Sequence, residues 1–148
     1  MRRYIYVLLF GAAAIAVAAC DEPLSRIAGP TPNLEPTFAS IQRDIFEAPD
    51  STGRPNCNKC HTSIGRTPTG GMSLDHDVAY ASLVNMPSSR KPGATRVIPG
   101  DPENSYIVHK VLGLSDIVGV RMPFAGPYLS DGQILILKRW IAIGAPRN

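Results

Sequence analysis

Cys57-Asn58-Lys59-Cys60-His61 is the stretch that most constrains the fold of this 148-residue chain. It is a C-x-x-C-H run, the signature for attachment of a c-type haem. Two thiols at this spacing can form thioethers with the two vinyl groups on one edge of a porphyrin, and His61 then lies under the iron as its proximal ligand. The run therefore predicts one covalent haem c, held by Cys57 and Cys60.

Three other interpretations of the run are weaker. A C-x-x-C pair can be a redox dithiol, but that motif normally belongs to a βαβ-type domain, which this chain does not suggest. A structural zinc site needs four protein ligands, and neither His76 nor His109 has finger-like spacing from the cysteines. A disulfide between Cys57 and Cys60 would close a very small, strained loop. Haem attachment is favoured, provided that the chain is exported.

Residues 1–19 have the pattern of a signal peptide. Arg2 and Arg3 form a short basic region, and the run from Tyr4 to Ala19 carries no charge. This run is shorter than the ~20 residues that a bilayer span needs. We therefore expect export of the chain in a bacterium.

Val17-Ala18-Ala19-Cys20 resembles a bacterial lipobox, whose cysteine is lipidated and becomes the mature N-terminus. The alternative is an ordinary signal peptide with an incidental cysteine. Assigning Cys20 to lipid, and Cys57 and Cys60 to haem, leaves no stray thiol. The sequence predicts a periplasmic domain anchored to a membrane, inner or outer.

Composition argues against nucleic acid as a partner. The formal charge of +3 falls near +1 when Arg2 and Arg3 leave with the signal peptide, because 13 basic and 12 acidic residues remain. Residues 20–36 hold four prolines and read as a proline-rich tether for the anchored domain, or as a plain disordered terminus. Residues 37–148 should form one domain.

Helical periodicity marks the two ends of this domain. Phe38, Ile41, Ile45 and Phe46 share one face of a helix that should end before Pro49. A last helix should begin after Ser130, with Gln133 completing a capping box and Leu129 and Ile134 forming a hydrophobic staple. Its apolar face consists of Ile134, Leu137, Trp140 and Ile141, and Gly144 and Pro146 should end it.

Two helices are expected between them. One should run from Leu74 to about Val84, capped by Ser73 or Asp75. The other should start at Asp101-Pro102 and stop at Gly113. Nothing alternates convincingly with period 2, so the fold class is mostly α: about four helices with long Gly/Pro loops wrapped around the haem.

A haem held by His61 needs a ligand on its other face. Met122 has the best context, because Pro123 stiffens the loop just before the last helix and restricts the residue ahead of it. Met86 also precedes a proline and is the main competitor. The remaining candidates are Met72, His76 and His109. Arg96 and Arg121 could pair with haem propionates, although surface arginine is the commoner case.

From about Phe38 to Ala145 the sequence resembles a small bacterial class I-type cytochrome c domain of the kind found in cytochrome-c-like lipoproteins. The matching pieces are Cys57 to His61, Val97 to Pro102, Ser105-Tyr106, His109-Lys110, Arg121 to Pro123, Leu129-Ser130, Trp140-Ile141 and Gly144-Ala145.

The resemblance implies that Cys57 and Cys60 carry the haem, that His61 is the proximal ligand of the iron, and that Met122 is the distal one. It also implies that the first and last helices cross beside the haem. That crossing would pair Phe38, Ile41 and Ile45 with Trp140 and Ile141.

The function expected is transfer of single electrons between redox protein partners. With both axial positions filled, no site is open for a small-molecule substrate, so we expect no enzymatic turnover. One alternative is a haem subunit or ligand sensor in which the distal methionine, Met122, is displaceable. A second alternative is a haem-free metal-binding or structural lipoprotein.

Overall fold

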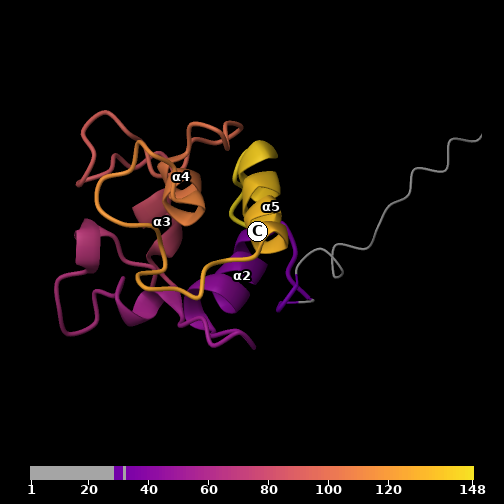
Figure 1. Ribbon diagram of the computed structural model, residues 1–148. Coiled ribbons are helices and arrows are strands. Elements are labelled where there is room, and N and C mark those ends of the chain that lie inside the picture. Colours follow the sequence, from indigo (N-terminus) through magenta and orange to yellow (C-terminus); the bar gives the residue numbers. More distant parts are fainter. Residues whose placement is uncertain (1–28, 32) are drawn as a thin grey trace, which may run out of the picture.

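The computed structural model describes residues 29–31 and 33–148 (Figure 1). The predicted signal peptide and Cys20 lie outside the described residues. Among those that are described, no helix is long and apolar enough to cross a membrane. The elements are α2 (Phe38–Ile41), η1 (Gln42–Glu47), η2 (Cys57–Lys59), η3 (Thr69–Gly71), α3 (Ala79–Leu83), α4 (Tyr106–Leu112) and α5 (Asp131–Ala142).

The expectation of a mostly helical chain with about four helices is confirmed. α2 continues directly into the π-helical η1, so the two count as one helical segment beside α3, α4 and α5. The described residues contain no strand. They contain isolated bridges, Val84 with Val97, Pro87 with Thr95, and Ile98 with Asp101.

The first helical segment has the face that the sequence predicts. Phe38, Ile41, Ile45 and Phe46 are all buried, and the segment ends at Glu47. Thr37 caps its start, because its hydroxyl accepts from the backbone N–H of Ser40 at 3.2 Å. The π-helical hydrogen bonding of η1 was not predicted.

The last helix is also confirmed. The Ser130 hydroxyl accepts from the Gln133 backbone N–H at 3.2 Å, and the Gln133 side chain accepts from the Ser130 N–H at 2.9 Å. This is the predicted capping box. Both staple residues and the whole predicted apolar face are buried: Leu129, Ile134, Leu137, Trp140 and Ile141.

The second helix is shorter than predicted, and its predicted start is wrong. α3 begins at Ala79 rather than Leu74, and neither Ser73 nor Asp75 caps it. Instead, the Ser73 hydroxyl donates to the Asp75 carboxylate at 2.7 Å, and that carboxylate also accepts from the Ser63 N–H at 2.8 Å. The Ser73–Asp75 bond is local, and side-chain bonds of this kind compete with helix formation.

The predicted start of the third helix is wrong for the same reason. α4 begins at Tyr106, not at Asp101-Pro102. The Asp101 carboxylate accepts from the backbone and side-chain N–H groups of Asn104, at 3.1 and 2.7 Å, and closes a separate turn. The predicted end is confirmed, because Gly113 adopts the left-handed conformation that ends helices (φ +74°).

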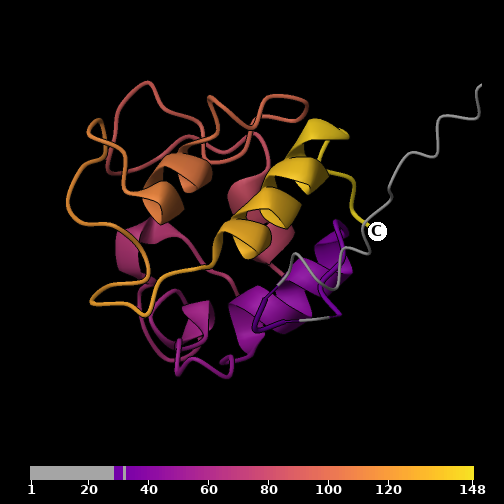
Figure 2. The ribbon, with the colours of Figure 1, turned by 45° about the vertical axis from the view of Figure 1, so that its right-hand side comes forward.

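The first and last helices lie side by side in Figures 1 and 2. The ring of Phe38 contacts that of Trp140 with centroids 5.6 Å apart, and meets Tyr80 of α3 edge to face at 5.1 Å. The chain end closes this contact, since Asn148 accepts from the backbone N–H groups of Phe38 and Ala39. In the segment assigned to the tether, Leu34 is only 1% exposed and joins the same core.

Arg54 lies fully buried between the first helical segment and the C-x-x-C-H run. Its Nε donates to the Asp50 carboxylate at 2.8 Å. Its Nη1 and Nη2 groups donate to four backbone carbonyls, those of Asp44, Ile45, Ala48 and Pro55. The first three belong to the end of the helical segment, where carbonyls lack partners within the helix.

Asp50 connects this cluster to the last helix. Besides Arg54, it accepts from Thr52 and from the Gln133 side chain at 3.2 Å. Burial alone would raise the pKa of Asp50, but hydrogen bonds from Thr52, Arg54 and Gln133 outweigh it and lower the pKa to about 2. The carboxylate therefore stays charged at ordinary pH.

Replacing Arg54 with alanine should destabilise the fold by about 3–5 kcal/mol, because Asp50 would become an unpaired buried charge. Urea denaturation measures the change. Arg43→Ala is the matched control: Arg43 also pairs with an aspartate, Asp44, but its side chain is 63% exposed. We expect no measurable effect there. Equal losses in the two variants would contradict this role of Arg54.

Candidate haem site

The two cysteines and the histidine of the C-x-x-C-H run lie on one helical turn. η2 begins at Cys57, whose carbonyl accepts from the backbone N–H of Cys60 at 3.2 Å and from that of His61 at 3.1 Å. The imidazole is therefore one turn beyond the first thiol, with the second thiol between them. The turn therefore keeps the three candidate side chains close together along the chain.

The two thiols have different surroundings. The Cys57 thiol is half-buried and donates to the Ile45 carbonyl at 3.2 Å, the carbonyl that Arg54 also binds. Burial raises the pKa of Cys57 to about 11, although the positive charge of Arg54 opposes the rise. Cys60 is exposed, and neither cysteine is in a disulfide.

His61 is oriented by the turn that follows it. Its Nδ1 lies 2.9 Å from the Thr69 carbonyl, which can only accept. The neutral ring therefore carries its proton on Nδ1, and Nε2 keeps the lone pair that a metal needs. Burial lowers the pKa of His61, although hydrogen bonding to the backbone of Thr69 and Met72 opposes the change. The neutral form of the ring, the form that can bind a metal, is therefore favoured.

The loop between α4 and α5 holds Met122. In both ribbon views it crosses the side of the molecule on which η2 and η3 lie (Figures 1 and 2). The Met122 N–H donates to the Lys110 carbonyl at 2.9 Å, and Arg121 Nε donates to the Val111 carbonyl at 2.8 Å. The Tyr106 hydroxyl accepts from the Val118 N–H at 2.8 Å.

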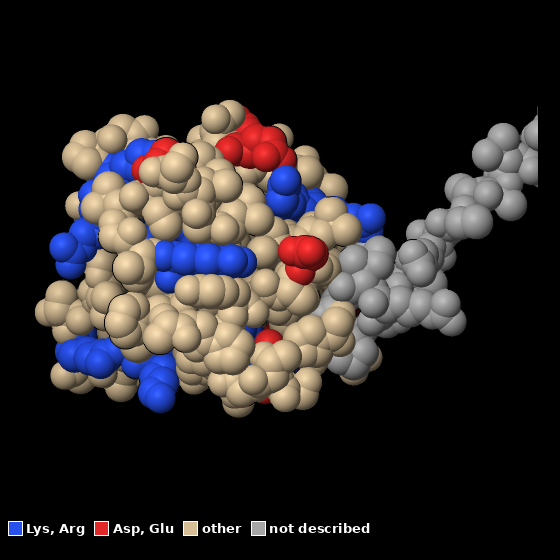
Figure 3. All heavy atoms as spheres, viewed as in Figure 1, with Lys and Arg blue, Asp and Glu red and all other residues tan. Residues whose placement is uncertain are grey.

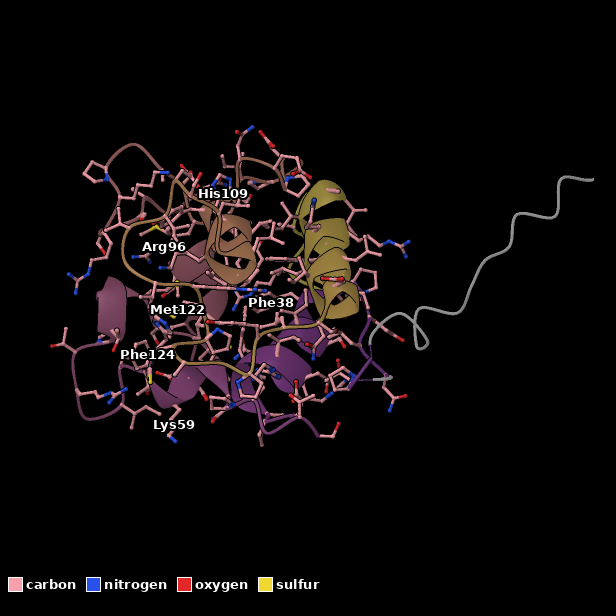
Figure 4. All side chains as sticks on the ribbon, viewed as in Figure 1. Phe38, Lys59, Arg96, His109, Met122 and Phe124 are labelled. Carbon is pink, nitrogen blue, oxygen red and sulfur yellow. The ribbon has the colours of Figure 1, made fainter. Side chains whose placement is uncertain are left out.

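These contacts fasten the loop to α4 at several points. Met122 therefore lies on a restrained segment, and the residue is half-buried (Figure 4). Its peptide bond to Pro123 is cis. Arg121 also stacks on Tyr128, with 4.1 Å between the guanidinium carbon and the ring centroid.

The other candidate distal ligands are less suitable. His109 lies between Asp116, 2.8 Å from Nδ1, and the Glu103 carbonyl, 2.6 Å from Nε2, so both ring nitrogens are engaged. The exposed His76 pairs with Glu47 at 3.2 Å. Met72 packs against the core, and Met86 is exposed; these are the two remaining methionine candidates.

The described residues contain no cluster of three or more His, Cys, Asp or Glu side chains that could hold a metal ion. Neither His76 nor His109 therefore joins the two cysteines in a zinc-type ligand set. Cys20, the predicted lipidation residue, lies outside the part of the chain that the structure describes.

Sequence reasoning missed two residues that shape this site. Nothing in the loop around Arg54 marks it as buried. Thr69 was also not singled out, although the Gly70-Gly71 pair after it signals a tight turn: both glycines have positive φ, +67° and +62°. The signal identifies the turn but not the carbonyl that meets His61.

Comparison with known proteins identifies no relative. No protein-family model matches the chain, and neither a curated protein nor a solved structure matches it.

In the haem-free full-length chain, Cys57 should react with iodoacetamide at least about tenfold more slowly than Cys60 near pH 8, because only the thiolate attacks. Mass spectrometry of the alkylated peptides measures both rates. In urea the two rates should converge. Native rates that are already equal would show that the Cys57 thiol is not buried against Ile45.

Proposed function

We propose that this protein is an exported, lipid-anchored monohaem c-type cytochrome that carries single electrons between redox proteins. Cys57 and Cys60 would hold the haem covalently, with His61 as proximal and Met122 as distal ligand of the iron. The observation that carries the proposal is the C-x-x-C-H run on one helical turn, with His61 Nδ1 engaged by the Thr69 carbonyl.

The chemistry of the donor set fits haem c. Two free thiols are available for thioethers, and a histidine with its second nitrogen bonded to a carbonyl is the usual form of a metal ligand. The neutral thioether of Met122, on a loop fastened to α4, would complete a His/Met pair of the kind that gives cytochromes c a high potential. Both ring nitrogens of His109 are engaged, so it could ligate a metal only by giving up one of these two hydrogen bonds.

Apolar side chains that the α4–α5 loop exposes also support the proposal, because a porphyrin needs apolar cover. Phe124 is 72% exposed, and near the haem run Ile64 is 78% exposed. The loop further exposes Leu114, Val118, Val120 and Tyr128. Figure 3 shows wide uncharged areas between basic side chains on this view of the molecule.

When bound, haem would supply a one-electron change between ferric and ferrous iron. His61 and Met122 would ligate the iron, and apolar side chains of the chain would cover the cofactor, so we expect no enzymatic turnover. The partners would be other redox proteins that meet it through small, transient contacts. The anchor at Cys20 would keep it on the periplasmic side of a bacterial membrane.

Covalent haem should depend on Cys57 and Cys60 and not on Cys20. We expect a haem-stained band on a denaturing gel when the full chain is expressed in a host that matures c-type cytochromes. Cys57→Ser with Cys60→Ser should abolish the stain, since no thioether can form. Cys20→Ser is the control and should keep the stain while releasing the protein from the membrane fraction.

An unstained wild-type band from that host would overturn the proposed function. A stain that survives the loss of both Cys57 and Cys60 would place the haem elsewhere.

Met122→Ala should remove the weak far-red absorption band of the oxidised protein that methionine ligation of haem iron produces, and should let carbon monoxide bind the reduced iron quickly. Met86→Ala is the matched control, because Met86 also precedes a proline and is exposed. Loss of the band in Met86→Ala alone would transfer the distal role to Met86. Rapid carbon monoxide binding by the wild type would favour a ligand sensor.

A further inference from the structure

Arg96 is a buried cation without a carboxylate partner among the described residues. Arg96 is 7% exposed, and none of the ion pairs within residues 29–31 and 33–148 includes it. Nη1 donates to the Ser82 carbonyl at 2.7 Å, and Nη2 donates to the Gly71 carbonyl at 3.0 Å. Buried charges are normally paired with an opposite charge. Arg96 has no such partner among the described residues, so its positive charge inside the protein is largely unneutralised.

The Gly71 carbonyl belongs to the η3 turn that orients His61. η3 begins at Thr69, whose carbonyl accepts from His61 Nδ1 at 2.9 Å. Ser89 also holds this turn, because its hydroxyl donates to the Gly70 carbonyl. A Cβ on Gly71 would lie 3.1 Å from the Ser89 oxygen, so the turn is closely packed against this residue.

We propose that Arg96 is a positioning residue for His61 and that its buried charge raises the reduction potential of the haem held there. The inference rests on the proposed function. By clamping Gly71, Arg96 fixes the Thr69 carbonyl and with it the imidazole plane. By its charge, it disfavours the extra positive charge of the ferric state, and low-dielectric surroundings strengthen that effect.

Arg66 provides a natural comparison. It also lies on the His61 segment, where Nη2 donates to the carbonyls of Lys59 and Cys60 at 2.8 and 2.7 Å, but its side chain is exposed. The charge of Arg66 is screened by dissolved salt, whereas that of Arg96 is largely shielded from it.

The test uses the haem-loaded full chain and two measurements: the midpoint potential at low and high salt, and the solvent exchange rate of the His61 Nδ1 proton by NMR. Arg96→Gln should shift the potential to more negative values at both salt concentrations and speed the exchange. Arg66→Gln should give a smaller shift that shrinks with salt, with unchanged exchange. Ser89→Ala should speed the exchange but leave the potential close to the wild-type value.

Arg96→Lys keeps the positive charge but loses the forked contact with the Ser82 and Gly71 carbonyls. It should therefore speed exchange of the His61 Nδ1 proton while leaving the midpoint potential close to the wild-type value. The same variant replaces Arg96→Gln in the test if Arg96→Gln does not fold. An unchanged potential in Arg96→Gln, or a large fall in Arg96→Lys, would overturn the electrostatic role. Unchanged exchange in both Arg96 variants would overturn the positioning role. Absence of covalent haem in the wild type would overturn the proposed function and this inference together.

Discussion

The buried ion pair of Arg54 with Asp50 joins the end of the first helical segment and the loop before the C-x-x-C-H run to α5, which lies far along the chain. Arg54 binds the carbonyls at the end of the first helical segment and the Pro55 carbonyl just before the C-x-x-C-H run, and Asp50 receives the Gln133 side chain of α5. All five guanidinium N–H groups have acceptors. Such a fully satisfied buried network tolerates little displacement, so Cys57 has a fixed place relative to both terminal helices.

Loops, rather than helices, present the two proposed iron ligands. His61 follows a single turn and is oriented through Thr69, while Met122 sits on a long loop fastened to α4 by Arg121 and by backbone contacts. In both cases side chains bind backbone carbonyls in place of a regular hydrogen-bond ladder. This arrangement gives loops rich in glycine and proline the rigidity that a preorganised ligand set needs.

The sequence-based predictions succeeded where the deciding interactions join residues close together in the sequence. The first and last helices were predicted because their apolar period and caps depend on residues three or four apart, such as Ser130 and Gln133. The starts of α3 and α4 were predicted wrongly. Asp101 closes a turn of its own with Asn104, and Asp75 accepts from the backbone N–H of Ser63, twelve residues earlier. A helix cap and such contacts use the same residue types.

The chemical character of the candidate site was readable from five consecutive residues, since the reach of two thiols and one imidazole is a local matter. Its orientation was not. The Thr69 carbonyl on His61, the burial of Arg54 and Arg96, and the engagement of both His109 nitrogens arise from folded contacts. Sequence periodicity carries information about which face of an element is buried, but polar partners brought together by loops leave no periodic pattern, so only the folded chain could identify them.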